Sequence, residues 1–132
     1  MIFSGAAIAE ATRGRLLQDG PAGPISTDSR RITEGSWFVA LSGDRFDGHA
    51  FLPHVSAANG AGAIVQTPPA HWNRGLIQVS DTLQALQDLG RAARKALHCP
   101  VVGITGSAGK TSTRVMVVDV LRALGTVHHT QG

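Results

Sequence analysis

The chain has 132 residues, of which 42% are hydrophobic and 16% charged, and this balance excludes a disordered polar tail and a coiled coil. The net charge of +3 comes from basic residues scattered along the sequence, which excludes a nucleic-acid-binding stripe but allows anionic ligands. One cysteine excludes an intrachain disulfide framework and fits a reduced, cytoplasmic setting, and no apolar stretch is long enough to cross a membrane. The length suits one compact domain, with or without part of a second.

The first half of the sequence alternates between helix-like and strand-like segments. Capping residues, chain breakers and apolar runs set the bounds of each segment. In chain order we expect a helix over 6–11 capped by Ser4, a loop over 19–24, a strand over 25–27, a turn at 34–35, a strand over 37–41, a loop over 42–49 and a helix over 50–58.

The second half continues this alternation. In chain order we expect strands over 63–65 and 76–79, a helix over 82–97 capped by Ser80 or Asp81, a strand over 101–105, a helix over 110–124 with Gly125 as its C-terminal cap, and a strand beginning at 127–129. The apolar residues of the helix over 82–97 recur at helical spacing and predict a buried face made of Leu83, Leu86, Leu89, Gly90, Ala93 and Leu97.

A glycine-rich turn between the strand over 101–105 and the following helix predicts a phosphate-binding loop. Glycines let backbone N–H groups approach phosphate oxygens, and the helix N-terminus favours an anion. Lys110 can reach the β- and γ-phosphates of ATP, and the Thr111 hydroxyl can hold Mg²⁺. The expected ATP-binding residues are Gly106, Ser107, Ala108, Gly109, Lys110, Thr111 and Ser112.

This loop matches a shortened phosphate-binding pattern. Ile104 stands where the full pattern has a glycine, so Gly-x-x-Gly-Lys-Thr remains. The alternative is a glycine-rich turn whose lysine is only solvated, but the flanking strand and helix favour phosphate binding. We therefore expect an α/β fold with a boundary near 98–100: residues 1–98 form a small mixed-sheet N-terminal domain, and residues 99–132 form the first strand–P-loop–helix of a P-loop ATPase domain.

Four motifs resemble the Mur ligases, which are ATP-dependent enzymes that add amino acids to the peptidoglycan precursor. The glycine-rich loop over 106–111 resembles their ATP loop, and Thr27-Asp28-Ser29-Arg30 followed by Gly35-Ser36-Trp37-Phe38-Val39-Ala40-Leu41 resembles their opening motif. Two segments, 43–51 and 79–86, resemble the branch of the family that adds D-alanyl-D-alanine. Ala50 departs from that pattern, in which an acidic residue is usual. The resemblance covers about the first third of such a ligase.

The resemblance implies that residues 1–98 bind the UDP end of the precursor. A hydroxyl and backbone groups would read uracil, while arginine and histidine would meet phosphate charge. Two alternatives stay open: an Asx-bonded turn at Asp28-Ser29-Arg30, and a solvated surface pair of Arg45 with Asp47. The residues that the resemblance places near UDP are Asp28, Ser29, Arg30, Arg45, Phe46, Asp47, Gly48 and His49.

For a complete enzyme, the resemblance implies ligation of D-Ala-D-Ala to UDP-MurNAc-tripeptide through an acyl phosphate, with ATP and Mg²⁺. Lys110 would then act catalytically by neutralising phosphate charge. We expect this chain to be inactive alone. The alternatives are a stand-alone module that binds the UDP precursor, and a sister ligase that adds the third residue of the peptide. A small P-loop kinase is disfavoured, because 132 residues are too few for a complete kinase core after the N-terminal domain.

Apolar residues cover much of the circumference of the segment 113–124. This helix must therefore pack on the first domain, pair with another chain or be poorly ordered. His128 and His129 suggest a metal site, but adjacent residues of a strand point to opposite faces, which favours a structural or solvated role.

Overall fold

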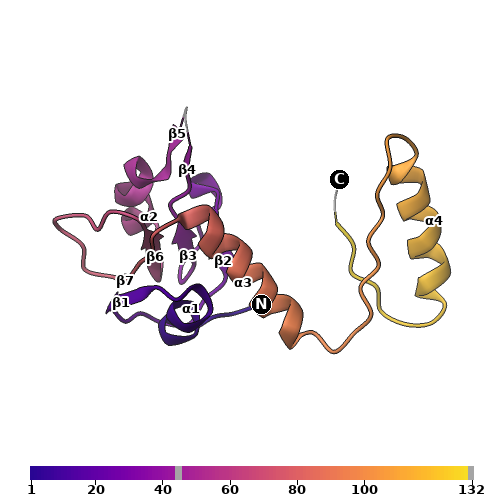
Figure 1. The fold of residues 1–132 in the computed structure, drawn as a ribbon, viewed down its shortest axis with the longest axis horizontal. Helices are drawn as coiled ribbons and strands as arrows, with labels where there is room; N and C mark the ends of the chain where they lie inside the picture. The colour runs from indigo at the N-terminus through magenta and orange to yellow at the C-terminus, as the bar shows by residue number, and fades with distance from the viewer. Residues whose placement is uncertain (44–45, 131–132) are drawn as a thin grey trace. The chain divides into compact units, whose positions relative to one another are not determined.

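The computed structural model describes residues 1–43 and 46–130 and divides the chain into two compact units, Met1–Leu97 and His98–Gly132. Within the described residues no helix has the length and apolar character needed to span a membrane. The elements are α1 (Gly5–Thr12), β1 (Arg15–Gln18), β2 (Ile25–Ser26), η1 (Ser29–Arg31), β3 (Trp37–Val39), β4 (Ser42–Gly43), β5 (Phe46–Asp47), η2 (Gly48–Phe51), α2 (Leu52–Ala57), β6 (Gly62–Val65), β7 (Gly75–Gln78), α3 (Thr82–Ala96) and α4 (Lys110–Arg122) (Figure 1).

The first unit is built on a five-stranded mixed sheet with the strand order β1-β7-β6-β3-β2. Strands β2, β3, β6 and β7 run parallel, and β1 pairs antiparallel with β7 at the edge. The α/β class expected from the sequence is therefore confirmed. Because neighbouring strands are parallel, the segments that follow β2, β3, β6 and β7 leave the sheet at the same edge, which we call the carboxyl edge.

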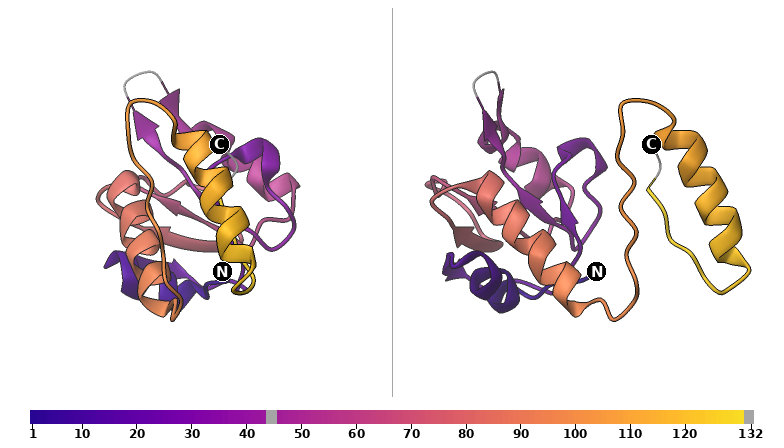
Figure 2. Two further views of the ribbon diagram at one scale, coloured as in Figure 1. Left: turned by 90° about the vertical axis from the view of Figure 1, so that its right-hand side faces the viewer. Right: turned by 45° about the vertical axis from the view of Figure 1, so that its right-hand side comes forward.

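Helices cover both faces of this sheet. Alternate residues of each strand point to opposite faces, so Trp37 and Val39 lie in one core while Phe38 and Ala40 lie in the other. Helices α1 and α3 pack on the first face and α2 packs on the second, as the two views in Figure 2 show. The strands β3 and β6 are buried on both sides, as expected for central parallel strands.

Trp37 is the largest fully buried side chain of the first core. Its indole N–H donates a hydrogen bond of 2.8 Å to the carbonyl oxygen of Pro21. A glycine is required beside the ring, because a Cβ at Gly75 would lie 2.4 Å from a ring carbon of Trp37. The indole and its glycine neighbours thus fix how β3 packs against β7 and the loop after β1.

Two predicted helix caps are confirmed. Ser4 precedes α1 and its hydroxyl accepts the N–H of Ala7 at 3.2 Å. Asp81 precedes α3 and its carboxylate accepts the N–H groups of Leu83 and Gln84 at 2.7 and 3.0 Å. These side chains satisfy amide groups that have no partner within the first turn of a helix.

The first unit differs from the expectations in three places. Strand β1 was not expected, and the predicted loop over 42–49 contains a short antiparallel pair, β4 with β5, followed by η2. On α3 the expected burial is confirmed at Leu89 and in part at Leu86, but Thr82 and Ala85 are also buried and Leu83 is 53% exposed. Ala85 lies in the core that α3 forms with α1 and the sheet, so a small residue shares the buried face with the predicted Leu89.

The second unit contains one regular element, α4, within the part of the chain that the structure describes. The strands expected over 101–105 and at 127–129 are absent there. Helix α4 ends at Arg122, and its C-cap is Ala123 in the right-handed conformation instead of Gly125. A strand is stable only when its backbone groups pair with a neighbour. No described strand pairs with these segments, so their β-like sequences form no regular secondary structure.

Candidate functional site

The residues expected near UDP come from two segments at the carboxyl edge. Asp28, Ser29 and Arg30 follow β2, and Phe46 to His49 follow β3. Ligands of open α/β sheets bind at this edge, because there the loops after several strands come together. Arg45 lies outside the described residues. The described residues that the sequence predicts near UDP therefore all lie at the carboxyl edge of the sheet.

Asp28 and Arg30 form a closed pair. The guanidinium Nε and Nη2 each donate to one carboxylate oxygen of Asp28 at 2.9 Å, and the backbone N–H of Arg30 donates to Oδ1 at 3.0 Å. Side-chain and then backbone hydrogen bonds from Arg30 lower the pKa of Asp28 to about 2, and the same side-chain bond raises the pKa of Arg30. The Asx-bonded turn considered from the sequence is therefore present, with Asp28 as the cap of η1.

Ser29 lies between these two residues and is half-buried at the first position of η1. Its hydroxyl is held on a short helix whose backbone is fixed by the Asp28 cap. A small polar group in a fixed position can read the edge of a base. The Asp28–Arg30 pair therefore fixes the backbone on both sides of Ser29.

The segment after β3 turns sharply back toward the sheet at Gly48. The Gly48 N–H donates to Leu41 O at 2.7 Å, and a Cβ on Gly48 would lie 2.7 Å from that same oxygen. Phe46 stacks on Phe51 with ring centroids 5.4 Å apart, and both rings are exposed. A glycine is thus needed here so that the chain can approach the end of β3.

Asp47 and His49 connect this segment to the end of β6. Asp47 Oδ1 accepts the backbone N–H of His49 at 2.9 Å and lies 2.6 Å from its Nδ1. His49 Nε2 accepts the backbone N–H of Gln66 at 3.0 Å and that of Thr67 at 3.4 Å. The backbone hydrogen bond, followed by the ring hydrogen bond, lowers the pKa of Asp47. The side chain of His49 is 17% exposed.

A cleft of about 470 Å³ opens between the segments that follow β3 and β6. It is polar on one side and bounded by two prolines on the other. Its lining residues are Ser42, Asp47, His49, Leu52, Gln66, Thr67, Pro68 and Pro69. The wall after β6 is not identified from the sequence, because Thr67-Pro68-Pro69 is interpreted there only as the end of a strand. The available signal is that this segment follows a parallel strand and so lies at the carboxyl edge.

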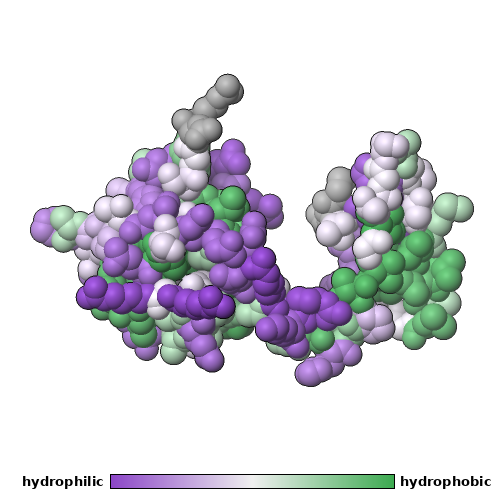
Figure 3. Space-filling model, in the orientation of Figure 1, coloured by the Kyte–Doolittle hydropathy of each residue, from purple (hydrophilic) through white to green (hydrophobic). Residues whose placement is uncertain are grey.

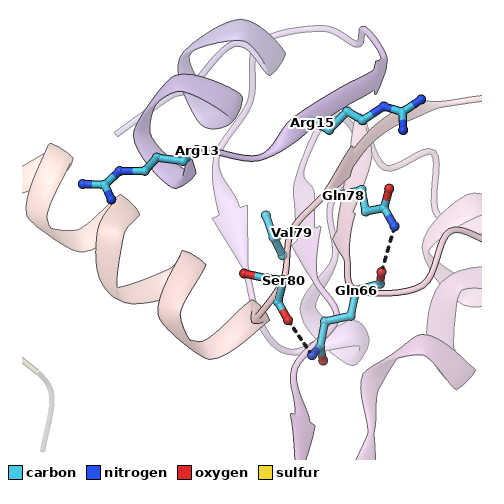
Figure 4. A pocket seen from close by; sticks show the side chains of 6 residues that line it. All are labelled: Arg13, Arg15, Gln66, Gln78, Val79 and Ser80. Atoms are coloured by element: carbon cyan, nitrogen blue, oxygen red, sulfur yellow. Dashed lines mark hydrogen bonds between the residues drawn. The ribbon is translucent and has the colours of Figure 1, made fainter.

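A second cleft of about 390 Å³ lies further along the same edge, near the end of β7. Figure 4 shows that the guanidinium groups of Arg13 and Arg15 extend away from each other, so they do not converge on one anion. The side-chain amides of Gln66 and Gln78 donate to the carbonyl oxygens of Ser80 and Gln66, at 3.1 and 3.3 Å. This second cleft is therefore a less suitable ligand site than the first.

The glycine-rich loop of the second unit leads directly into α4. Gly106 and Gly109 have φ values of 154° and 74°, which side chains rarely adopt, and Gly109 stands at the N-cap of α4. Lys110 Nζ donates to the carbonyl oxygen of Gly106, so the side chain folds back over the loop. Ser107, Ala108, Thr111 and Ser112 are all exposed around the same turn. Glycines with positive φ and a lysine at the start of the following helix are features that phosphate-binding loops share.

The described residues contain no cluster of three or more histidine, cysteine or acidic side chains that could hold a metal ion. His128 and His129 are both exposed. Thr111, on the first turn of α4, offers a hydroxyl next to the loop. A divalent cation here would depend on that hydroxyl and on the phosphates themselves, which is how Mg²⁺ is commonly bound beside nucleotides.

Comparisons with known proteins find similar sequences in one family. The model of the Mur ligase family, catalytic domain, matches residues 24–104. The chain is 36% identical over 118 residues to the UDP-N-acetylmuramoyl-tripeptide–D-alanyl-D-alanine ligase of Synechocystis sp., covering 88% of this chain and 26% of that protein. It is 40% identical over 112 residues to the ligase of the same name from Bacillus subtilis, covering 82% and 24%.

Two further similarities add a sister enzyme and a solved structure. The chain is 38% identical over 106 residues to a UDP-N-acetylmuramoyl-L-alanyl-D-glutamate–2,6-diaminopimelate ligase of Bacillus cereus, covering 76% of this chain and 21% of that protein. A crystal structure of MurF from Acinetobacter baumannii matches with a TM-score of 0.88 and 32% identity, over 100% of this chain and 30% of that one. The chain spans about a quarter of the length of the curated relatives it matches.

Proposed function

The chain belongs to the Mur ligase family, and from this we propose that it is the N-terminal part of an ATP-dependent ligase of peptidoglycan synthesis. In this proposal the complete enzyme joins D-Ala-D-Ala to UDP-MurNAc-tripeptide through an acyl phosphate, in the cytoplasm. Residues 1–98 hold the UDP end of the precursor, and residues 99–132 begin the ATP-binding domain. The observation that carries the proposal is the gathering of the Asp28–Arg30 turn, the Asp47–His49 segment and the 470 Å³ cleft at one carboxyl edge.

At this edge the residues divide into those that contact the ligand and those that support them. Ser29, half-buried on η1, presents a hydroxyl to the uracil, and exposed backbone groups around it complete the contact. Asp28 fixes the turn, while Arg30 balances the charge of Asp28 and keeps an exposed guanidinium beside the diphosphate. Phe46 adds an exposed aromatic face at the end of the β4–β5 pair. Most of the binding energy for UDP is then expected from fixed backbone and a few polar side chains.

The glycine-rich loop fits ATP, because its left-handed glycines and the N-terminus of α4 suit a chain of phosphates. When bound, ATP supplies the phosphoryl group that activates the terminal carboxylate of the tripeptide for attack by the amine of D-Ala-D-Ala. Lys110 leaves the Gly106 carbonyl to reach phosphate oxygens and neutralises charge that develops there. The Thr111 hydroxyl holds Mg²⁺, and the backbone N–H groups over 106–112 donate to the phosphates.

Calorimetric titration of the 132-residue chain with UDP-MurNAc-tripeptide tests the UDP half of the proposal. We expect saturable binding that Ser29→Ala weakens and Ser80→Ala, at the end of β7, leaves unchanged. The absence of saturable binding at millimolar ligand would reject it. Because the relatives are about four times longer than this chain, we expect no ATP-dependent phosphate release from these residues alone, and a steady release would contradict that expectation.

A sister activity is the second candidate, because the chain is 38% identical to a 2,6-diaminopimelate ligase. That enzyme, by its name, acts on the precursor that ends in D-glutamate, one residue shorter. A comparison of affinities for the dipeptide and tripeptide precursors separates the two candidates. Clearly tighter binding of the dipeptide precursor would favour the sister activity, and clearly tighter binding of the tripeptide precursor would favour the D-Ala-D-Ala ligase.

A further inference from the structure

The hydrogen-bond partners of His49 determine where its ring carries a proton. The N–H groups of Gln66 and Thr67 can only donate, so Nε2 must offer them its lone pair. The carboxylate of Asp47, whose pKa is lowered, can only accept, so Nδ1 must carry the proton and donate it. The ring is therefore neutral, with its single N–H on Nδ1.

We propose that His49 is a positioning residue, a neutral clamp that joins the segment after β3 to the segment after β6 and so holds the two walls of the carboxyl-edge cleft together. This differs from the role expected from the sequence, in which histidine meets phosphate charge. With Nδ1 on Asp47 and Nε2 on Gln66, neither ring nitrogen is left to bind a ligand.

The wall after β6 needs such a clamp because of its sequence. Pro68 and Pro69 have no backbone N–H and follow Gln66 and Thr67 directly. The N–H groups of Gln66 and Thr67 are therefore the last backbone donors before the prolines, and both point to Nε2 of His49. Loss of this acceptor would leave two backbone donors without their partner and would release the proline wall of the cleft.

The clamp also depends on the short helix η2. Asp47 caps η2 through the backbone N–H of His49 and at the same time orients the ring of His49 through Nδ1. One carboxylate oxygen thus fixes both the backbone and the side chain of the same residue. Gly48, packed against Leu41, allows the turn that brings these groups to the edge of the sheet.

Long-range proton–nitrogen NMR of the histidine rings tests the clamp without any ligand. We expect His49 to show one neutral tautomer with the proton on Nδ1. A ring of His49 that carries its proton on Nε2, or that averages between the two tautomers, would overturn the inference. This measurement uses the unaltered chain, so it does not depend on whether a variant folds.

The same spectra distinguish a clamp from a phosphate contact. If His49 only positions the cleft, addition of UDP leaves the proton on Nδ1 and Nε2 unprotonated. If His49 meets the diphosphate directly, UDP would drive the ring to its doubly protonated form, and that result would overturn the inference.

Two variants separate the two hydrogen bonds of the His49 ring, the one to Gln66 and the one to Asp47. His49→Gln places a carbonyl oxygen near the position of Nε2 and keeps an acceptor for Gln66, whereas His49→Asn keeps only a donor for Asp47. We expect His49→Asn and His49→Ala to weaken UDP binding by roughly tenfold, as is usual when a supporting group is lost, and His49→Gln to restore most of it. His54→Gln serves as the matched control and should not change affinity. Equal affinity for UDP in the wild type and His49→Ala would overturn the positioning role.

The effect on affinity rests on the proposed function, whereas the tautomer does not. If the wild-type chain shows no binding of UDP, the proposed function fails and the expected affinity loss fails with it. The proton position is then still decided by the ring spectrum. The two failures are therefore distinguishable within one set of samples.

Discussion

Helices α3 and α4 are of similar length, 15 and 13 residues, but they bury their apolar side chains to very different extents. Helix α3 places Thr82, Ala85 and Leu89 against α1 and the sheet. Helix α4 buries Val118, while Met116 is 69% exposed and Leu124, just beyond its end, is 83% exposed. Figure 3 shows the apolar surface that results on the second unit.

The difference shows that an apolar pattern predicts a helix more reliably than it predicts a core. Both helices form, because hydrogen bonding within a helix is local. A core requires a second layer, and in the first unit the five-stranded sheet supplies it. The described part of His98–Gly132 contains no strand that could supply such a layer for α4.

The largest expected effect is on the free energy of unfolding, and it compares a core residue of the first unit with an exposed residue of α4. Trp37→Ala removes the largest buried side chain of the first unit and its hydrogen bond to Pro21, and should lower the free energy of unfolding by about 3–5 kcal/mol. The matched truncation Met116→Ala in α4 should change it by less than about 0.5 kcal/mol. Denaturant unfolding of both variants checks this, and a large effect of Met116→Ala would show that α4 is packed.

Hydrogen exchange compares the two units directly. Amides of β6, which is buried on both faces, should exchange at least about a hundredfold more slowly than amides of α4 over 113–122. The reason is that helical hydrogen bonds without covering side chains open frequently. Strong protection of α4 in a chain shown to be monomeric would mean that the first unit covers it, and strong protection only in a self-associated form would mean that a second copy does.

Arg74 tests a polar anchor of the first unit. Its guanidinium donates to the carbonyl oxygens of Ser56 and Gly60, at 2.9 and 3.1 Å, and to the side chain of Asn59 at 2.9 Å, all at the end of α2. Arg74→Ala should lower the free energy of unfolding by about 1–3 kcal/mol, because these acceptors lose a charged donor. Arg122→Ala in α4, which removes an exposed pair with Asp119, is the matched control and should cost less than about 0.5 kcal/mol.

The smallest effect concerns Asp28. The pKa of Asp28 is about 2, below its ordinary value of 3.8. The pair with Arg30 therefore stabilises the folded chain at pH values above 3.8, and this contribution is lost as the pH falls through about 2. Arg30→Ala should return the pKa toward 3.8, as followed by the carboxyl carbon shift of Asp28 in NMR. An unchanged low pKa in Arg30→Ala would show that other groups hold the charge.

Local signals in the sequence account for most of the elements that were predicted correctly. Ser4 and Asp81 are residues that typically cap helices, and the apolar runs of β3, β6 and β7 are typical of buried parallel strands. Strand β1 could not be predicted in this way, because its sequence Arg-Leu-Leu-Gln has no strand signal and its conformation depends on pairing with β7. Strands β4 and β5 have two residues each and are too short to give a pattern.

The candidate site likewise contains residues that the sequence identifies and residues that only the structure identifies. Asp28, Ser29, Asp47 and His49 could be identified because they lie in motifs that resemble a known family. The contribution of Gln66 and Thr67 could not, because they act through backbone N–H groups, which every residue except proline has. The proton position of His49 is a property of those contacts and becomes visible only in the folded chain.

The central claim is that the carboxyl edge of the first unit binds the UDP end of a peptidoglycan precursor. Backbone NMR of the chain during titration with UDP-MurNAc-tripeptide tests it most directly. The account predicts saturable shifts at Asp28 to Arg31 and at Gln66 and Thr67, with little change at Gly62 and Gly75, which begin β6 and β7 at the opposite edge. Saturable shifts at Gly62 and Gly75 with none at the carboxyl edge, or no saturable shift at all, would contradict it.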